Sequence, residues 1–275
     1  MKILRIKING LPLYKNSFDI SFIAIQRVQT THMDSVFHLF GNIYVNTVEA
    51  FAGINASGKT TALKVMTFTN FLLGAAPLSA DFVPQILDEN GHAIIDIDFF
   101  ADKKIFHLTS EICRTKKEDG SNSVKILAEK LWKKPVTSKI NKTNLFAFDG
   151  ITPVRVRDQT DEYLPDDVSI MIAVNKQMKD GHMFVDLAFF TNFNLFLPDG
   201  GSVPTEIISL LDPTIEYINI ENINDKVITR LKFYRQKEMV LLNPSELNVF
   251  LSSGTVKGVR VFSDALRVLK KGGYL

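Results

Sequence analysis

Alternating apolar and polar residues at the start of the chain predict β-strands. In residues 2–8 lysine and arginine alternate with isoleucine and leucine, and in residues 18–25 serine and aspartate alternate with phenylalanine and isoleucine. A period of two places one face of each strand in a core and the other face in solvent. We therefore expect two amphipathic strands in this region.

A glycine-rich turn separates a third apolar segment, residues 47–51, from a stretch with helical spacing. Residues 60–73 place apolar side chains near three- and four-residue intervals and contain no proline. The predicted order is strand, glycine loop, helix.

Period two returns in the middle of the chain. Residues 94–100 and 105–112 are separated by a polar turn at 101–104, which predicts an antiparallel hairpin. Residues 115–142 are polar and lysine-rich, and we expect a mobile or solvated excursion there. Prolines then punctuate short apolar pieces up to about Phe233, which indicates an irregular α+β insertion.

Composition narrows the class of protein. Of the 275 residues, 45% are hydrophobic and 23% are charged, which excludes a disordered chain. The net charge of +2 indicates no particular partner, so a polyanion would have to bind a local basic patch. The most apolar stretch outside the amino terminus, residues 71–76, is far shorter than the ~20 residues of a spanning helix. The single cysteine, Cys113, favours a reducing compartment. We expect a cytoplasmic protein.

The turn before the predicted helix carries a phosphate-binding motif. Residues 53–60 read G-I-N-A-S-G-K-T, a full match to G-x-x-x-x-G-K-[ST]. The glycines let successive N–H groups converge on one anion, and the following helix adds its positive end. Lys59 would reach the β- and γ-phosphate oxygens, and the Thr60 hydroxyl would bind the bridging Mg²⁺. The expected cofactor-binding residues are Gly53, Asn55, Ala56, Ser57, Gly58, Lys59, Thr60 and Thr61.

An eight-residue match can arise by chance in an ordinary turn, but the predicted flanking strand and helix favour nucleotide binding. The form G-x-N-x-S-G-K-T after an N-terminal antiparallel hairpin resembles the ABC-type ATPase heads of the SMC, RecF and OLD (overcoming lysogenization defect) proteins. That resemblance implies ATP and Mg²⁺ as cofactors.

A second motif lies near the carboxyl end. Residues 251–255 read L-S-S-G-T and precede apolar residues at helical spacing, so a helix begins there. Serine is also a common N-cap, which alone would explain the pattern. The pentapeptide resembles the ABC signature motif. The resemblance implies that Ser252, Ser253 and Gly254 bind nucleotide held by another subunit, with the Ser252 hydroxyl and the Gly254 N–H as donors.

The sequence shows no Walker B strand after the signature helix. Residues 94–98 and 183–186 end in aspartates, but both precede that helix and are better interpreted as hairpin strands. The expected position follows residues 272–275. We therefore expect Walker B, the D-loop and the switch histidine beyond the end, as in a truncated product, a fragment or half of a split head, and we assign no catalytic residue.

Nucleic acid is a further candidate partner. Trp132 could stack a base while Lys133 and Lys134 contact phosphates, although a solvated polar face explains the same residues. The five histidines show no metal-binding spacing.

Together these features predict an α/β P-loop NTPase of the ABC type, with N-terminal antiparallel β-strands and a large α+β insertion. We expect an ATP-binding lobe at 1–112, the insertion at 113–239 and the signature helix at 240–275. The predicted function is an ATPase head that dimerises around ATP, or joins a partner subunit that supplies Walker B, in nucleic-acid maintenance or phage defence. The alternatives are an ATP-dependent assembly module without hydrolysis of its own and a P-loop kinase or GTPase.

Overall fold

The computed structural model describes most of the chain and divides it into two compact units. The described residues are 1–12, 14, 17–78, 86–87, 91–116, 118, 120–157, 164–179, 184, 201–223 and 226–275. The units are Met1–His182 and Met183–Leu275. Within the described residues, no helix is both long enough and apolar enough to span a membrane.

The first unit is built mainly from strands. Its elements are β1 (Lys2–Asn9), β2 (Phe18–Ser21), the 3₁₀ helix η1 (Thr30–Ser35), β3 (Val36–Phe40), β4 (Ile43–Asn46), α1 (Lys59–Gly74), β5 (His92–Ala101), β6 (Lys104–Lys116), β7 (Asn122–Pro135), β8 (Arg155–Val156) and α2 (Met171–Asn175).

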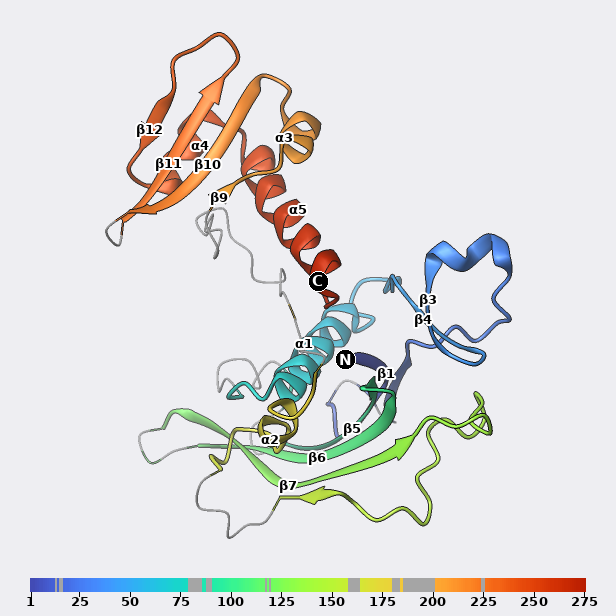
Figure 1. Cartoon of the computed structure of the whole chain (residues 1–275). Coiled ribbons are helices and arrows are strands. Elements are labelled where there is room, and N and C mark those ends of the chain that lie inside the picture. Colours follow the sequence, from blue (N-terminus) through green and yellow to red (C-terminus); the bar gives the residue numbers. More distant parts are fainter. Residues whose placement is uncertain are drawn as a thin grey trace. The chain divides into compact units, whose positions relative to one another are not determined.

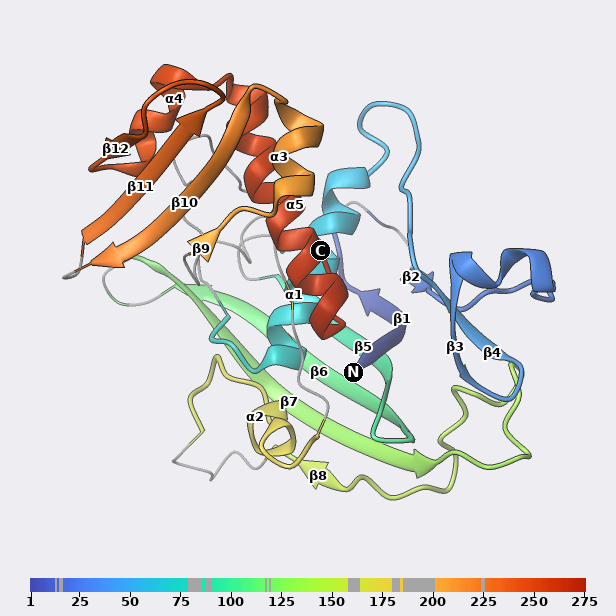
Figure 2. The same cartoon turned by 45° about the horizontal axis from the view of Figure 1, so that its top comes forward.

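A six-stranded antiparallel sheet, ordered β2-β1-β5-β6-β7-β8, forms the first unit's platform. Helix α1 lies over one face of it (Figures 1 and 2). Alternate residues of β5, such as Ile95, Ile97 and Phe99, are fully buried, as is Phe68 of α1. The period-two pattern of the sequence therefore provides the apolar face on which the helix rests.

The structure confirms several predicted elements. Strands β5 and β6 form the predicted hairpin, and its two turn residues, Asp102 and Lys103, both have positive φ, 47° and 59°. Such a pair matches the twist of the strands that it joins. Helix α1 spans the predicted helix, and β1 matches the first predicted strand.

Three predictions for the first unit are wrong. The lysine-rich residues 115–142 are no excursion, because they contain β7, which pairs along its length with β6. Residues 47–51 form no strand, since a strand requires a hydrogen-bonded neighbour and no described segment pairs with them. The second predicted strand, 18–25, ends at Ser21, and the hairpin of β3 and β4 follows it unforeseen.

Strand pairing in the described residues is antiparallel throughout, apart from a single parallel bridge between Phe184 and Tyr274. The α/β class is thus present with antiparallel sheets. The finer prediction, a P-loop NTPase fold of the ABC type, remains a prediction, and so do the three predicted domains.

The second unit packs helices on one face of a small sheet. Its elements are β9 (Gly201–Ser202), α3 (Thr205–Leu211), β10 (Ile215–Ile223), β11 (Lys226–Phe233), β12 (Met239–Leu241), the 3₁₀ helix η3 (Pro244–Glu246), α4 (Leu247–Phe250) and α5 (Ser253–Lys271). The strand order is β12-β11-β10-β9.

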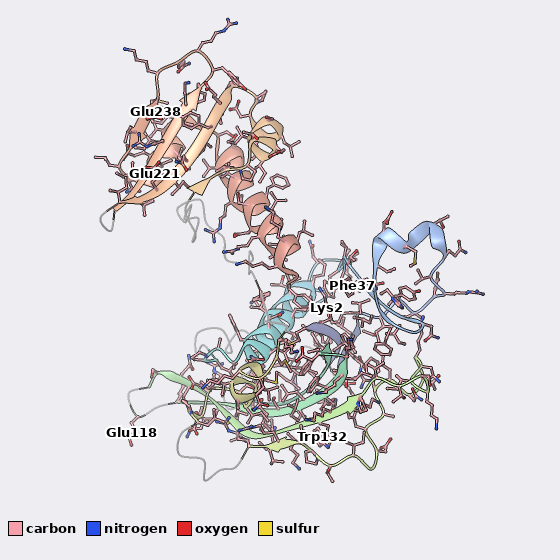
Figure 3. The ribbon with its side chains drawn as sticks, viewed as in Figure 1. Lys2, Phe37, Glu118, Trp132, Glu221 and Glu238 are labelled. Carbon is pink, nitrogen blue, oxygen red and sulfur yellow. The ribbon has the colours of Figure 1, made fainter. Side chains whose placement is uncertain are left out.

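The two faces of this second sheet differ in chemistry. Ile218 of β10 and Leu231 of β11 pack with Val256 of α5 in one buried cluster. Arg230 pairs with Glu221 at 3.3 Å and with Glu238 at 2.8 Å, and both carboxylates are labelled in Figure 3. Because side chains alternate between faces, the apolar and charged sets separate.

A buried carboxylate fastens β7 to the segment before α2. Glu129 accepts hydrogen bonds from the Ser110 hydroxyl at 2.7 Å, the Ser169 hydroxyl at 2.8 Å and the Ile170 amide at 2.7 Å. Its side chain is fully buried. Burial raises the pKa of Glu129, and the hydrogen bonds and the nearby Arg157 only partly oppose this rise.

This site predicts a pH-dependent effect of Glu129→Gln. Because the pKa of Glu129 is higher in the folded than in the unfolded chain, its contribution to stability is present below the unfolded pKa and is lost as pH rises through the folded pKa. The loss is about 1.4 kcal/mol for each pH unit that separates the two pKa values. The amide carries no charge, so the free energy of unfolding of the variant relative to wild type should rise between pH 5 and pH 8.

Urea titrations measure this difference through Trp132, the only tryptophan of the chain, which lies on the same strand. Ser110→Ala, which removes one hydrogen bond and no charge, is the control. A difference between Glu129→Gln and wild type that stays constant or falls with pH would contradict the role of ionisation.

Candidate functional site

The G-x-x-x-x-G-K-T segment forms a turn directly before α1. Two of its residues, Ala56 at φ 62° and Gly58 at φ 87°, occupy the left-handed region. For a residue with a Cβ, such as Ala56, this conformation is uncommon and tends to be found where backbone is shaped for a ligand. Left-handed residues within a turn direct neighbouring N–H groups toward a common side.

Helix α1 begins at this turn without a side-chain cap. Its N-cap is Gly58, and the first helical bond runs from the Ala62 amide to the Gly58 carbonyl at 2.9 Å. The amides of Lys59, Thr60 and Thr61 therefore have no intrahelical acceptor. Three donors and the positive end of a 16-residue helix face the turn.

The Lys59 ammonium folds back on the same turn. It donates to the carbonyl oxygens of Gly53 at 2.9 Å and Ile54 at 2.8 Å. The Ser57 amide also donates to the Ile54 carbonyl, at 3.2 Å. The lysine and the turn thus satisfy one another's hydrogen-bonding groups.

The remaining predicted loop residues are accessible. Asn55, Ala56 and Thr60 are exposed, and Thr61 is half-buried. A Cβ built on Gly53 would lie 2.5 Å from the Ser57 hydroxyl, so a side chain here would force that hydroxyl to rotate. The structure therefore brings all eight predicted residues into one turn and helix start.

The second predicted site lies in the other unit, at the start of α5. Ser252 is the N-cap, and its hydroxyl oxygen accepts from the Thr255 amide at 3.0 Å. Ser252, Ser253 and Gly254 are exposed. The N-cap interpretation is confirmed, and the amides of Ser253 and Gly254 remain without an intrahelical acceptor.

Two glycines of α5, Gly258 and Gly254, differ in how closely other residues pack against them. A Cβ on Gly258 would lie 2.5 Å from a methyl carbon of Leu211, so packing against α3 excludes a side chain. A Cβ on Gly254 would meet only the Ser252 hydroxyl, at 3.6 Å. The described contacts therefore leave room for a side chain at position 254.

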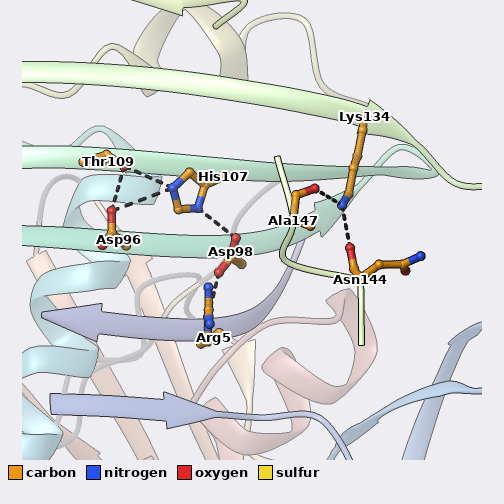
Figure 4. A network of polar contacts seen from close by, with 8 residues as sticks. All are labelled: Arg5, Asp96, Asp98, His107, Thr109, Lys134, Asn144 and Ala147. Atoms are coloured by element: carbon orange, nitrogen blue, oxygen red, sulfur yellow. Dashed lines mark hydrogen bonds and ion pairs between the residues drawn. The ribbon is translucent and has the colours of Figure 1, made fainter. Parts of the chain in front are cut away.

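The aspartates of β5 do not form a free acidic pair. Asp98 is fully buried and binds Arg5 Nε at 2.9 Å and His107 Nδ1 at 2.8 Å (Figure 4). Asp96 accepts from the Thr109 hydroxyl at 2.7 Å. These partners neutralise charge within the sheet, which agrees with placing both aspartates in hairpin strands. The other segment considered for the Walker B strand is residues 183–186, of which the structure describes only Phe184.

Three residues of the same network, Thr109, His107 and Asp98, are arranged in space like a catalytic nucleophile, base and acid. Thr109 Oγ1 lies 3.2 Å from His107 Nε2, and His107 Nδ1 contacts Asp98. The Thr109 hydroxyl hydrogen, however, points to Asp96. The hydroxyl hydrogen is thus directed at a carboxylate and not at His107, as a nucleophile–base pair would require.

The aromatic and basic residues of β7 are separated by the strand. Trp132 (Figure 3) and Lys134 share one face, and Lys133 lies on the other. The Lys134 ammonium donates to the carbonyls of Asn144 at 3.0 Å and Ala147 at 2.6 Å, and burial lowers its pKa. Lys134 is therefore occupied, and the predicted set of Trp132 with two lysines is not brought together.

Sequence reasoning missed Tyr14. Its hydroxyl donates to the Gly58 carbonyl at 3.3 Å across 44 residues of chain. No local pattern indicates this contact, because its two residues are 44 positions apart in the sequence.

Comparison with protein-family models gives no match, and comparison with curated proteins gives no significant match.

Proposed function

We propose that the chain is an ATP-binding head of the ABC type, similar to those of RecF, OLD and SMC proteins. The turn at 53–60 would hold the phosphates of ATP with Mg²⁺. The proposal assigns Ser252, Ser253 and Gly254 to nucleotide held by a second copy of the chain.

One observation carries the proposal: the motif precedes a helix whose first amides are uncapped and whose lysine lies on the turn. Gly58 provides no side chain, so Lys59, Thr60 and Thr61 present N–H groups outward. An anion at this position would gain several charge-assisted hydrogen bonds and the favourable field of the helix.

The residues of the turn indicate how binding would proceed. Lys59 would exchange two neutral carbonyl acceptors for phosphate oxygens, a stronger interaction because the new acceptors are charged. The exposed Thr60 hydroxyl would bind Mg²⁺, which supplies charge neutralisation between the β- and γ-phosphates when it is present. Each role follows from the position of the residue at the helix start.

Glycine at 254 supports a role for the start of α5 outside its own subunit. The fold leaves room for a side chain at position 254. A phosphate that approached the Gly254 amide closely would not leave that room, so it would favour glycine. We infer a head-to-tail pair in which each α5 start covers the γ-phosphate on its partner.

Hydrolysis is a separate question from binding. Asp96 and Asp98 are occupied by basic and hydroxyl partners, so we assign neither as a catalytic carboxylate. A chain that binds ATP and changes assembly state with negligible phosphate release would be the non-hydrolysing alternative. A kinase or GTPase would instead bind nucleotide without assembling through α5. Roles in nucleic-acid maintenance or phage defence rest on the resemblance alone.

Lys59→Ala should weaken Mg-ATP binding by at least about 10-fold. The substitution removes an ammonium that would exchange two neutral carbonyl acceptors for charged phosphate oxygens, and charge-assisted bonds are about twice as strong, so the net loss is about 1.5–3 kcal/mol. Isothermal titration calorimetry measures the affinity, and Lys64→Ala on the same helix is the matched control. Equal affinity in Lys59→Ala and wild type would refute the phosphate role of the loop.

Ser252→Asp should prevent ATP-dependent dimerisation while Ser252→Asn permits it. Both residues cap a helix about as well as serine, so α5 is kept in each variant. Only the carboxylate repels a γ-phosphate. Light scattering with a non-hydrolysable ATP analogue measures the change in mass. Dimerisation that is equally strong in both variants would exclude a phosphate facing Ser252.

A further inference from the structure

Tyr14 contacts Gly58, the N-cap residue of helix α1. Its ring packs on Phe18 with centroids 4.9 Å apart, and its amide donates to the Leu11 carbonyl at 3.1 Å. The ring is thus held against the first residue of β2, and the amide against the Leu11 carbonyl. From there the hydroxyl reaches the Gly58 carbonyl at 3.3 Å.

The Tyr14 ring occupies the space that a side chain at position 58 would need. A Cβ on Gly58 would lie 2.4 Å from the tyrosine oxygen and 3.1 Å from its ζ carbon. Gly58 is therefore required twice, by its positive φ of 87° and by this contact. The tyrosine closes one side of the N-cap where no side-chain cap exists.

The contact also fixes the direction of the next amide. The Gly58 carbonyl accepts from the Ala62 amide at 2.9 Å and from Tyr14, so two donors hold this peptide plane. In a trans peptide the N–H points opposite to the C=O. The Lys59 N–H is consequently held pointing out of the helix, toward the turn.

We propose that Tyr14 is a positioning residue for the phosphate site: its hydroxyl holds the Gly58 peptide so that the Lys59 amide faces the β-phosphate. This role rests on the proposed function. It acts through the backbone, and the aromatic ring is required only to place the hydroxyl.

Tyr14→Phe tests the proposal because it removes the hydroxyl and keeps the ring. We expect Mg-ATP and Mg-ADP affinities to fall by the same factor, about 3- to 10-fold, as for the loss of one hydrogen bond, since both nucleotides carry a β-phosphate. In the nucleotide-free chain, exchange of the Ala62 amide should accelerate by a similar factor. Tyr44→Phe, in β4 of the same unit, is the matched control.

The outcomes separate the two proposals. If wild type binds ATP and Tyr14→Phe changes neither affinity nor Ala62 exchange, the role of Tyr14 is wrong and nucleotide binding stands. If Tyr14→Phe binds normally while Tyr14→Leu loses affinity, the ring contacts the nucleotide directly and the positioning role is overturned. If wild type binds neither nucleotide, both proposals fail.

Discussion

The start of helix α1 is the constraint on which the proposed site depends. The helix begins at Gly58, which has a left-handed backbone and no side chain, and its first three amides have no intrahelical acceptor. Proteins usually satisfy such donors with a serine, threonine or aspartate cap. Here the turn places Lys59 beside its own carbonyls, so cation and donors lie within a few residues of one another. We infer that the donors and the lysine together would bind an anion.

The antiparallel sheet gives this helix a rigid base. Its apolar face buries Ile95, Ile97 and Phe99. Its other face pairs Asp98 with Arg5 and His107 within the sheet. The division between the faces follows from the alternation of side chains along each strand. The apolar face is therefore free of these ion pairs and packs against α1.

Local sequence patterns predicted the elements whose structure depends on neighbouring residues. They failed for elements and contacts that depend on residues far apart in the sequence. The β5–β6 hairpin and α1 follow from periodicity, and the turn at 53–58 follows from its glycines. Strand β7 was missed because its exposed lysines conceal the buried alternate positions, and residues 47–51 look like a strand yet find no described partner. Neither Glu129 nor Tyr14 carries a local signal, since their contacts join segments 41 and 44 residues apart.

We propose that the uncapped amides of α1 hold the phosphates of ATP. A titration of the ¹⁵N-labelled chain with Mg-ATP, followed by amide NMR shifts, tests this proposal. We expect the largest shifts on the turn and helix start, at residues 53–61, and only small shifts there with AMP, which has no β-phosphate. Shifts that are largest elsewhere in the chain, or equal for ATP and AMP, would contradict it.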